Sequence, residues 1–394
     1  MVWYLHGGIM NLLTTLGLLA GLLAQARRPG DELKLTPSAH YDLRHSVSEE
    51  RAKEILDYLE KFHDAALELL QPDRPEETAK KKATIVLYGT GIEYQATNPL
   101  PHAHGYYSAG RIVSHDGEPT QTLQVLAHEV IHHLTDITSV NFELLPYWFV
   151  EGIAECLANC DVREGKLWFC VPTGSVLMSR LPKVQSNMEL GRWYPLKADE
   201  NTMQDIRTLP RTEFYDDSSL AYSEAWALCH FLLTFGDDGK NPIPKGRYAK
   251  NFMQYYKEIR SGKVKPVEAW AKAFPDLDLE KLQGEWKDFV MAMDKGNLLG
   301  VWGAEVSEPE RAKLGVSEID TGVRLTVVTP GWPGDKAGLQ AGDIILRYDS
   351  LTLTKGGAMA RLTDLAEQTA GSRPIVIRIR RDGKDLERTV PKER

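Results

Sequence analysis

Apolar residues recur every three to four positions in several long stretches of the chain, which is the pattern of amphipathic helices. One such helix is predicted over residues 46–70. A second is predicted over residues 120–135, where the apolar positions form one continuous stripe. Further helices are predicted over residues 147–159, 219–235, 248–261 and 279–293. The middle of the chain is therefore predicted to be mainly helical.

Short strands are predicted before this helical region. Residues 83–88 (ATIVLY) are short, largely apolar and rich in β-forming residues, which is typical of a buried strand. A Gly-, His- and Tyr-rich stretch at residues 101–110 leads into residues 111–113, which we predict to be an edge strand. The helices would therefore pack beside a small N-terminal sheet.

The pattern changes after residue 298, where β-type segments dominate. One helix is predicted over residues 359–368. Residues 374–380 and 386–390 are predicted to pair as a hairpin across Asp382-Gly383, a strong tight-turn signal. The predicted fold class is α+β, with a mainly helical domain that carries a small N-terminal sheet, followed by a β-rich domain.

Composition excludes several classes of protein. The 394 residues are 42% hydrophobic and 26% charged, which is ordinary globular usage and long enough for two or three domains. The formal net charge is −8, the opposite of a non-specific nucleic-acid binder, so no nucleic-acid partner is expected. No stretch of about 20 apolar residues is present to span a bilayer in the mature chain.

An export signal is predicted at residues 1–26. Residues 12–24 form an uncharged apolar run, and Ala24-Gln25-Ala26 fits an A-x-A cleavage pattern. The expected location is periplasmic or extracellular. The alternatives are an uncleaved interfacial anchor and an internal helix.

The four cysteines are Cys156, Cys160, Cys170 and Cys229. Their spacing matches no zinc-ribbon or zinc-knuckle pattern. Export would permit disulfides, but four cysteines allow three pairings and the sequence does not choose between them. Buried free thiols are an equal alternative.

The chemistry of the chain is predicted to lie on the 120–135 helix, which carries an H-E-x-x-H motif at residues 128–132. Residues four apart lie on one helix face, so His128 and His132 can bind one Zn²⁺. Glu129 projects beside the metal, where a general base would deprotonate a zinc-bound water. The alternative is a pair of histidines without a metal.

A second segment follows eighteen residues after His132 and reads W-x-x-E-G-x-A-E. With the H-E-x-x-H motif, this spacing resembles the gluzincin metallopeptidases. The resemblance implies that Glu151 is the third ligand of one zinc ion per chain. It also implies that Glu155 holds the other ring nitrogen of a ligand histidine. The alternative is a solvated acidic helix face.

The same resemblance implies a tyrosine that stabilises the oxyanion of the transition state. Tyr222 lies at a suitable distance, with Tyr215 as its competitor. His230 fills this role in some relatives, but a packed histidine is the simpler interpretation. His102 and His104 are weaker candidates to line the cleft.

The chain lacks the G-x-M-E-N motif with which related aminopeptidases bind the substrate amine, which favours an endopeptidase. Its residues 40–295 resemble the compact peptidase MA-like group, in which a G-Y/F-Y segment precedes the zinc helix. Gly105-Tyr106-Tyr107 fits that segment. An edge strand there would bind an extended peptide by strand addition.

The C-terminal part, residues 298–392, resembles the bacterial PDZ domain. The likeness rests on residues 322–346, with a P-G-x-P turn, an A-G-L segment and a G-D-x-I-L strand. The resemblance implies a loop that binds the carboxylate of C-terminal peptides through backbone N–H groups. It maps onto Leu298, Leu299, Gly300 and Val301. The alternative is a PDZ-type spacer that binds no peptide.

Two functions remain open on the sequence. The first is an exported zinc-dependent peptidase in which Glu129 activates water and the PDZ domain binds substrate or partner C-termini. The second is a non-enzymatic binding or scaffold protein with a structural or vestigial zinc site. Two histidines and one glutamate leave a fourth position open for water, which favours the enzyme, because structural zinc is usually closed by four protein ligands.

Overall fold

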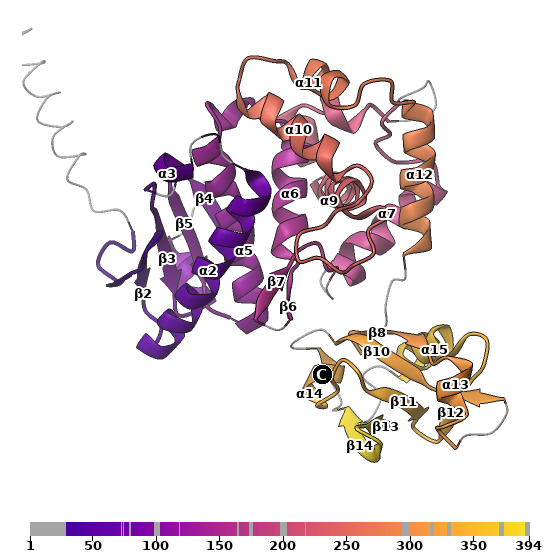
Figure 1. The fold of residues 1–394 in the computed structure, drawn as a ribbon. Coiled ribbons are helices and arrows are strands. Elements are labelled where there is room, and N and C mark those ends of the chain that lie inside the picture. Colours follow the sequence, from indigo (N-terminus) through magenta and orange to yellow (C-terminus); the bar gives the residue numbers. More distant parts are fainter. Residues whose placement is uncertain are drawn as a thin grey trace, which may run out of the picture.

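The computed structural model of the chain describes residues 29–71, 73, 75–78, 80–97, 103–117, 119–163, 165–172, 176–197, 203–216, 218–293, 299–315, 319–328, 332–369 and 374–390 (Figure 1). The predicted export signal, His102 and Leu298 lie outside these ranges. No helix within them is long and apolar enough to cross a membrane.

A five-stranded sheet forms the N-terminal part. Its strands are β1 (Lys34–Pro37), β2 (Tyr41–His45), β3 (Ala83–Tyr88), β4 (Gly105–Ser108) and β5 (Arg111–His115). They lie in the order β1-β2-β3-β5-β4. The central pairs β2/β3 and β3/β5 are parallel, and the outer pairs are antiparallel. The buried run predicted at residues 83–88 is confirmed as the central strand.

The prediction that residues 111–113 form an edge strand is wrong. These residues belong to β5, which pairs with β3 on one side and β4 on the other. The edge is instead β4, the Gly-Tyr-Tyr segment itself. The physical reason is burial, because Ile112, Val113 and Ser114 are all enclosed, as expected for an interior strand.

The helices follow the predicted periodicity closely. The predicted helices correspond to α2 (Glu49–Leu70), α5 (Pro119–Thr138), α6 (Tyr147–Ala158), α9 (Ser218–Thr234), α10 (Ala249–Arg260) and α12 (Leu279–Ala292). Ser48 caps α2, and its side chain accepts a hydrogen bond from the Arg51 N–H, so the helix begins later than predicted. The remaining α-helices among the described residues of this part are α3 (Pro75–Thr78), α4 (Gly91–Thr97), α7 (Leu181–Glu189), α8 (Arg211–Asp216) and α11 (Pro266–Ala273).

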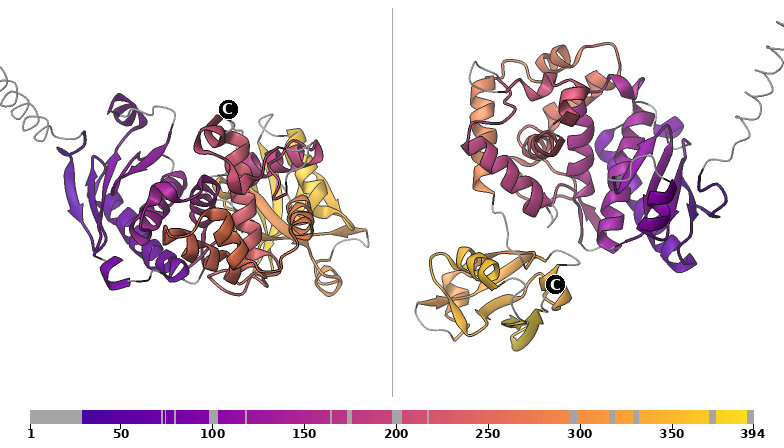
Figure 2. Two further views of the ribbon diagram at one scale, coloured as in Figure 1. Left: turned by 90° about the horizontal axis from the view of Figure 1, so that it is seen from above. Right: turned by 180° about the vertical axis from the view of Figure 1, so that it is seen from behind.

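Helix α9 lies at the centre of the helical part. Figure 1 and the right-hand view of Figure 2 look along it, and α6, α7, α10 and α12 surround it. Its closest partner is α6, and Gly152 explains why. A Cβ at this position would stand 2.5 Å from the carbonyl oxygen of Ala225 on α9. Only glycine lets the two helix backbones approach this closely.

The C-terminal domain is built on an antiparallel sheet. Its strands are β8 (Val301–Glu305), β9 (Asp320–Thr321), β10 (Val323–Val328), β11 (Ile344–Tyr348), β12 (Leu351–Thr354), β13 (Ile375–Arg381) and β14 (Lys384–Val390). Strand β8 is one edge of the order β14-β13-β11-β10-β8. The helices are α13 (Glu308–Arg311), α14 (Pro333–Lys336) and α15 (Ala358–Thr369), of which α15 packs against β8.

The hairpin prediction is confirmed in this domain. Strands β13 and β14 pair from Ile375 to Val390, and the turn residues Asp382 and Gly383 have φ angles of 51° and 75°. Two successive positive φ values define the turn type that matches the twist of paired strands. The largest apolar cluster of the N-terminal part and that of the C-terminal part are distinct. The α+β fold class is confirmed.

Candidate metal centre

Three ligand-type atoms converge between α5 and α6. His128 Nε2 lies 3.1 Å from His132 Nε2, and each nitrogen lies 3.4 Å from Glu151 Oε2. The two histidines are one turn apart on α5, and Glu151 comes from the first half of α6. The structure thus brings together the three residues predicted as metal ligands.

The geometry of this cluster fits zinc. Bonds of about 2.0–2.2 Å to imidazole and carboxylate place the ligand atoms of a tetrahedral site about 3.3–3.6 Å apart. The observed separations of 3.1 and 3.4 Å come close to that spacing with no rearrangement. Three protein ligands would leave the fourth position to water, which is the arrangement of a catalytic zinc site.

The charges of the cluster are tightly coupled. Burial alone would lower the pKa of His128, but Glu151 and Glu155 accept hydrogen bonds from its ring and raise the pKa to about 10. Burial alone would raise the pKa of Glu151, but the positive charges of His132 and His128 hold it well below its usual range. The Glu151 carboxylate is therefore ionised, the state in which it can bind a cation.

Glu129 follows His128 on α5 and is buried at the margin of the cluster. Burial raises its pKa above the usual range, against the charges of His128 and His132. Strand β4 passes directly alongside. A Cβ at Gly105 would stand 2.7 Å from Val125 and 3.4 Å from the Glu129 side chain. The edge strand of the sheet therefore borders the side chain expected to act as the base.

Glu155 lies one turn after Glu151 and supports His128. Its Oε2 lies 3.5 Å from His128 Nδ1, on the opposite side of the imidazole ring from Nε2. Arg180 donates two hydrogen bonds to the same carboxylate, from Nε at 2.8 Å and from Nη2 at 3.1 Å. Burial opposes ionisation of Glu155, but the charge of Arg180 and the hydrogen bond from His128 lower its pKa to about 2.

Sequence reasoning missed Arg180. It ends the short helical turn Val176–Arg180 before α7, and no motif surrounds it. Its guanidinium also lies over the ring of Tyr222, 5.5 Å from the ring centre. Arg180 thus connects the carboxylate that orients His128 to the tyrosine predicted for the transition state.

Both candidate tyrosines lie beside Glu151. Tyr215 donates a hydrogen bond to Glu151 Oε1 at 3.3 Å, and its ring centre lies 6.3 Å from that of Tyr222. Burial, with the charge of Glu151, raises the pKa of both hydroxyls. Both therefore stay protonated at neutral pH and can donate to an oxyanion.

His104, His133 and His230 lie outside this cluster. His133 Nε2 is 3.2 Å from the carbonyl oxygen of Lys81. His104 lies before β4, with its ring centre 6.0 Å from that of His115. His230 is buried in α9 beside Cys156 and Cys170.

The predicted carboxylate-binding loop is described for Leu299, Gly300 and Val301. Leu299 and Val301 are buried in the core of the C-terminal domain, and Gly300 has a φ angle of 70°. A Cβ at Gly300 would stand 2.5 Å from the Trp332 side chain, so the loop requires glycine here. Unlike Leu299 and Val301, Trp302 in β8 packs with the large apolar cluster of the N-terminal part.

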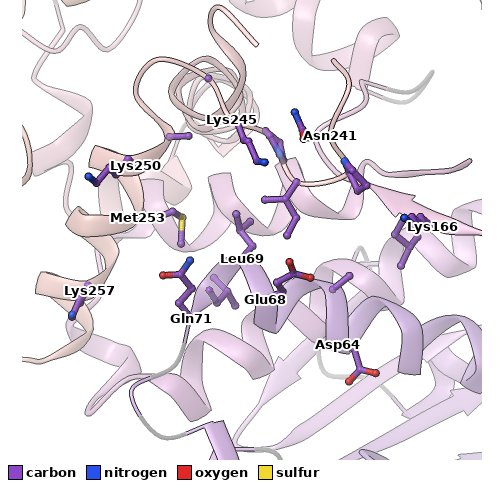
Figure 3. A pocket seen from close by; sticks show the side chains of 18 of the residues that line it. Asp64, Glu68, Leu69, Gln71, Lys166, Asn241, Lys245, Lys250, Met253 and Lys257 are labelled. Carbon is purple, nitrogen blue, oxygen red and sulfur yellow. The ribbon is translucent and has the colours of Figure 1, made fainter. Parts of the chain in front are cut away.

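A large hollow lies apart from the metal cluster. It encloses about 1100 Å³ between α2, the loop at residues 241–246 and α10 (Figure 3). Leu69 and Met253 lie in its middle, with Lys250 and Lys257 on one side and Asp64 on the other. None of the residues predicted to bind the metal lines it, and its charges are mixed.

Comparison with known proteins gives one family match. A family model described as a protein of unknown function, DUF1570, matches residues 122–239, which include the whole metal cluster. No curated protein sequence matches the chain.

The solved structures similar to this chain include the following three. An aminopeptidase N family protein from Idiomarina loihiensis is 14% identical, with a TM-score of 0.41 over 91% of this chain and 67% of that chain. The HtrA3 PDZ domain bound to a phage-derived ligand is 22% identical, with a TM-score of 0.20 over 24% of this chain and 83% of that chain. The HtrA-type protease AlgW with a decapeptide is 24% identical, with a TM-score of 0.20 over 28% of this chain and 34% of that chain.

Proposed function

We propose that the chain is a zinc-dependent peptidase. The observation that carries this proposal is the convergence of His128, His132 and Glu151, with the buried Glu129 beside them. The three ligand atoms have the spacing of a tetrahedral zinc site with one position left for water. Zinc held there would make a bound water acidic and polarise the scissile carbonyl.

The protein's own groups supply the proton transfers. Glu129 accepts the proton of the attacking water and delivers it to the leaving amine. Its raised pKa suits this role, because a carboxylate that binds a proton more readily is a better base near neutral pH. Glu155 and Arg180 keep the His128 ring in position through its second nitrogen.

A tyrosine hydroxyl supplies the remaining hydrogen bond. Tyr222 is our choice for the residue that donates to the oxyanion of the tetrahedral intermediate. Arg180 lies over its ring, and the neighbouring Tyr215 donates to Glu151. Tyr222 also interacts with Glu151 and Tyr215, and in this proposal its hydroxyl turns from Glu151 to the oxyanion when substrate binds, while Tyr215 stays on the third ligand.

The substrate we propose is an extended peptide segment. Strand β4 has a free edge and lies against α5 beside Glu129. A peptide added to this edge would present its backbone to the zinc and to the base. We further propose that the C-terminal domain binds peptide C-termini between β8, which also has a free edge, and α15.

Digestion of a diverse peptide library by the zinc-loaded full chain tests the proposal, with products identified by mass spectrometry. Glu129→Gln keeps all three ligands and loses the base, so cleavage should fall by about 10²–10⁴-fold while zinc stays bound. Glu143→Gln is the matched control, because Glu143 is an exposed glutamate that pairs with Arg211. It should cleave like the wild type.

The positions of the cuts distinguish an endopeptidase from an exopeptidase. Cleavage that survives in Glu129→Gln would contradict the assigned base. A zinc-loaded chain that cleaves nothing, while its C-terminal domain binds peptides, would favour a non-enzymatic binding protein.

A further inference from the structure

A second group of metal-ligating side chains lies in the core between α6, α9 and the segment after β7 (Lys166–Trp168). Cys156, Cys170 and His230 each place one ligand-type atom within 4.8 Å of the other two. The two Sγ atoms are 3.0 Å apart. We propose that these residues form a second, structural zinc site, distinct from the candidate catalytic centre.

The His230 imidazole is the first argument for a metal. It is 5% exposed, and its Nδ1 is buried without a hydrogen-bond partner among the residues that the structure describes. Burial lowers the pKa of His230 to about 4, so the ring is neutral at physiological pH. A buried polar nitrogen without a partner is costly, and binding to a metal would satisfy it.

The thiols are the second argument. Cys156 and Cys170 come from different elements, yet their sulfurs point at each other in the core. Thiolate and imidazole together form the donor set of structural zinc sites. The spacing of 3.0 Å is longer than a disulfide bond of about 2.05 Å and shorter than the roughly 3.8 Å between sulfurs that share a tetrahedral zinc. A disulfide would leave His230 without a partner, whereas zinc would bind all three side chains.

Cys229 is a candidate fourth ligand, although its Sγ does not belong to the group of atoms within 4.8 Å of one another and would have to approach it. Cys229 precedes His230 on α9 and is fully buried. Its Sγ would lie 2.7 Å from a Cβ at Gly152, which is one helical turn before Cys156 on α6. A closed site with three cysteines and one histidine is a common form of structural zinc. Zinc binding would release the thiol protons to solvent, and no redox step is involved.

The position of this site on α6 suggests what a bound metal would stabilise. Cys156 directly follows Glu155 on α6, the helix that also carries Glu151. A metal bound to Cys156, Cys170 and His230 would tie that helix to α9 and to the segment after β7. It would thereby fix the element that supplies a ligand and its supporting carboxylate to the other centre.

The test measures zinc at the second site after the candidate catalytic centre has been disabled. In the full chain, His132→Gln with Glu151→Gln removes two of the three ligands of the candidate catalytic centre. After dialysis against a weak chelator, this double variant should retain about one zinc ion per chain by elemental analysis, since the second site is intact. Adding Cys156→Ser should remove that ion.

Cys160→Ser is the matched control in the same background. Cys160 lies four residues after Cys156, and its Sγ is 3.2 Å from the hydroxyl of Tyr58 instead of belonging to the cluster. This control should keep its zinc. Cys229→Ala should weaken zinc retention if Cys229 is the fourth ligand, and an unchanged content would overturn only that assignment.

Cobalt substitution keeps the test decisive if the Cys156 variant does not fold. The double variant with all its cysteines should show thiolate-to-cobalt charge-transfer absorption, which His128, His132 and Glu151 cannot produce because they have no sulfur. Absence of both zinc and this absorption would overturn the proposal. So would two missing thiols in the denatured, unreduced chain, because that result means a disulfide. Neither result bears on the peptidase proposal.

Discussion

The two clusters of metal-ligating side chains share helix α6 but differ in their access to solvent. In the first, His132 and Glu151 are buried, but the His128 side chain is 17% exposed, and the free edge of β4 lies beside the adjoining Glu129. In the second, Cys156, Cys170 and His230 are 0%, 6% and 5% exposed. The ligand types differ as well. Two imidazoles and one carboxylate are typical of a catalytic zinc site with a bound water, whereas thiolates are typical of a structural site closed by protein ligands. One helix can therefore serve a reactive centre and a structural one.

The largest expected effect comes from Glu151→Gln, which breaks the first cluster alone. Gln keeps the size of the side chain but loses the charge that attracts the cation. We expect peptide cleavage to fall on the order of 10³-fold and the zinc content to drop by one ion per chain. Elemental analysis beside the cleavage assay checks this. Loss of all zinc would mean that the two clusters are not independent.

Substitution of either candidate tyrosine is expected to have a smaller effect than Glu151→Gln. Tyr222→Phe should lower kcat about 10²-fold with little change in KM, because the lost hydrogen bond forms only in the transition state. Tyr215→Phe removes its hydrogen bond to Glu151 and should instead weaken zinc affinity. Steady-state kinetics and zinc titration of both variants check the assignment. The opposite result would exchange the roles of the two residues.

Arg180→Met tests whether the first cluster depends on the ion pair between Arg180 and Glu155, which holds the His128 ring. Without the guanidinium, the Glu155 carboxylate loses two hydrogen bonds and holds His128 less firmly. Zinc affinity or cleavage should fall about 10–100-fold, with partial recovery in Arg180→Lys. The pH profile of cleavage gives a second readout, because Glu155 would then bind a proton at higher pH. Identical profiles for wild type and Arg180→Met would assign Arg180 a packing role only.

Much of the first cluster could be predicted from the sequence. Helical periodicity places His128 and His132 on one face, and the spacing to Glu151 carries the resemblance that named the third ligand. Arg180 could not be predicted, because its contact with Glu155 depends on how the chain returns before α7. The same holds for the second cluster. Cys170 and His230 lie 14 and 74 residues after Cys156, and they meet it only because α6 crosses α9 and the segment after β7 returns beside α6.

The crossing of α6 and α9, on which the second cluster depends, can be tested with Gly152→Ala. The added methyl would stand 2.5 Å from the Ala225 carbonyl oxygen, so the backbones of α6 and α9 must separate. We expect a loss of about 1–3 kcal/mol in the free energy of unfolding, measured by urea denaturation. Gly284→Ala is the control, because Gly284 lies on α12 with nothing within 4 Å of its added Cβ. That change should stabilise by about 1 kcal/mol.

The last prediction concerns acid, which would release metal from both clusters and would also protonate His63, a residue that belongs to neither. His63 is buried on α2, with its Nδ1 2.8 Å from the Tyr41 hydroxyl. Burial, together with the charges of His40 and His133, lowers the pKa of His63 from 6.5 to about 3. Between these two values the unfolded chain binds a proton that the folded chain does not. Stability is therefore complete above pH 6.5 and falls as the pH drops towards 3.

The expected contribution of His63 is a loss of about 2 kcal/mol between pH 6.5 and pH 5. His63→Gln has no proton to gain, so it should lack this part of the slope. Urea denaturation of the metal-free chains at the two pH values measures the difference directly. Equal slopes would mean that the acid sensitivity arises elsewhere. If the free energy of unfolding of His63→Gln depends less steeply on pH, the effect of His63 is known for the metal-free chain. Acid release of zinc from each cluster can then be measured against that metal-free baseline.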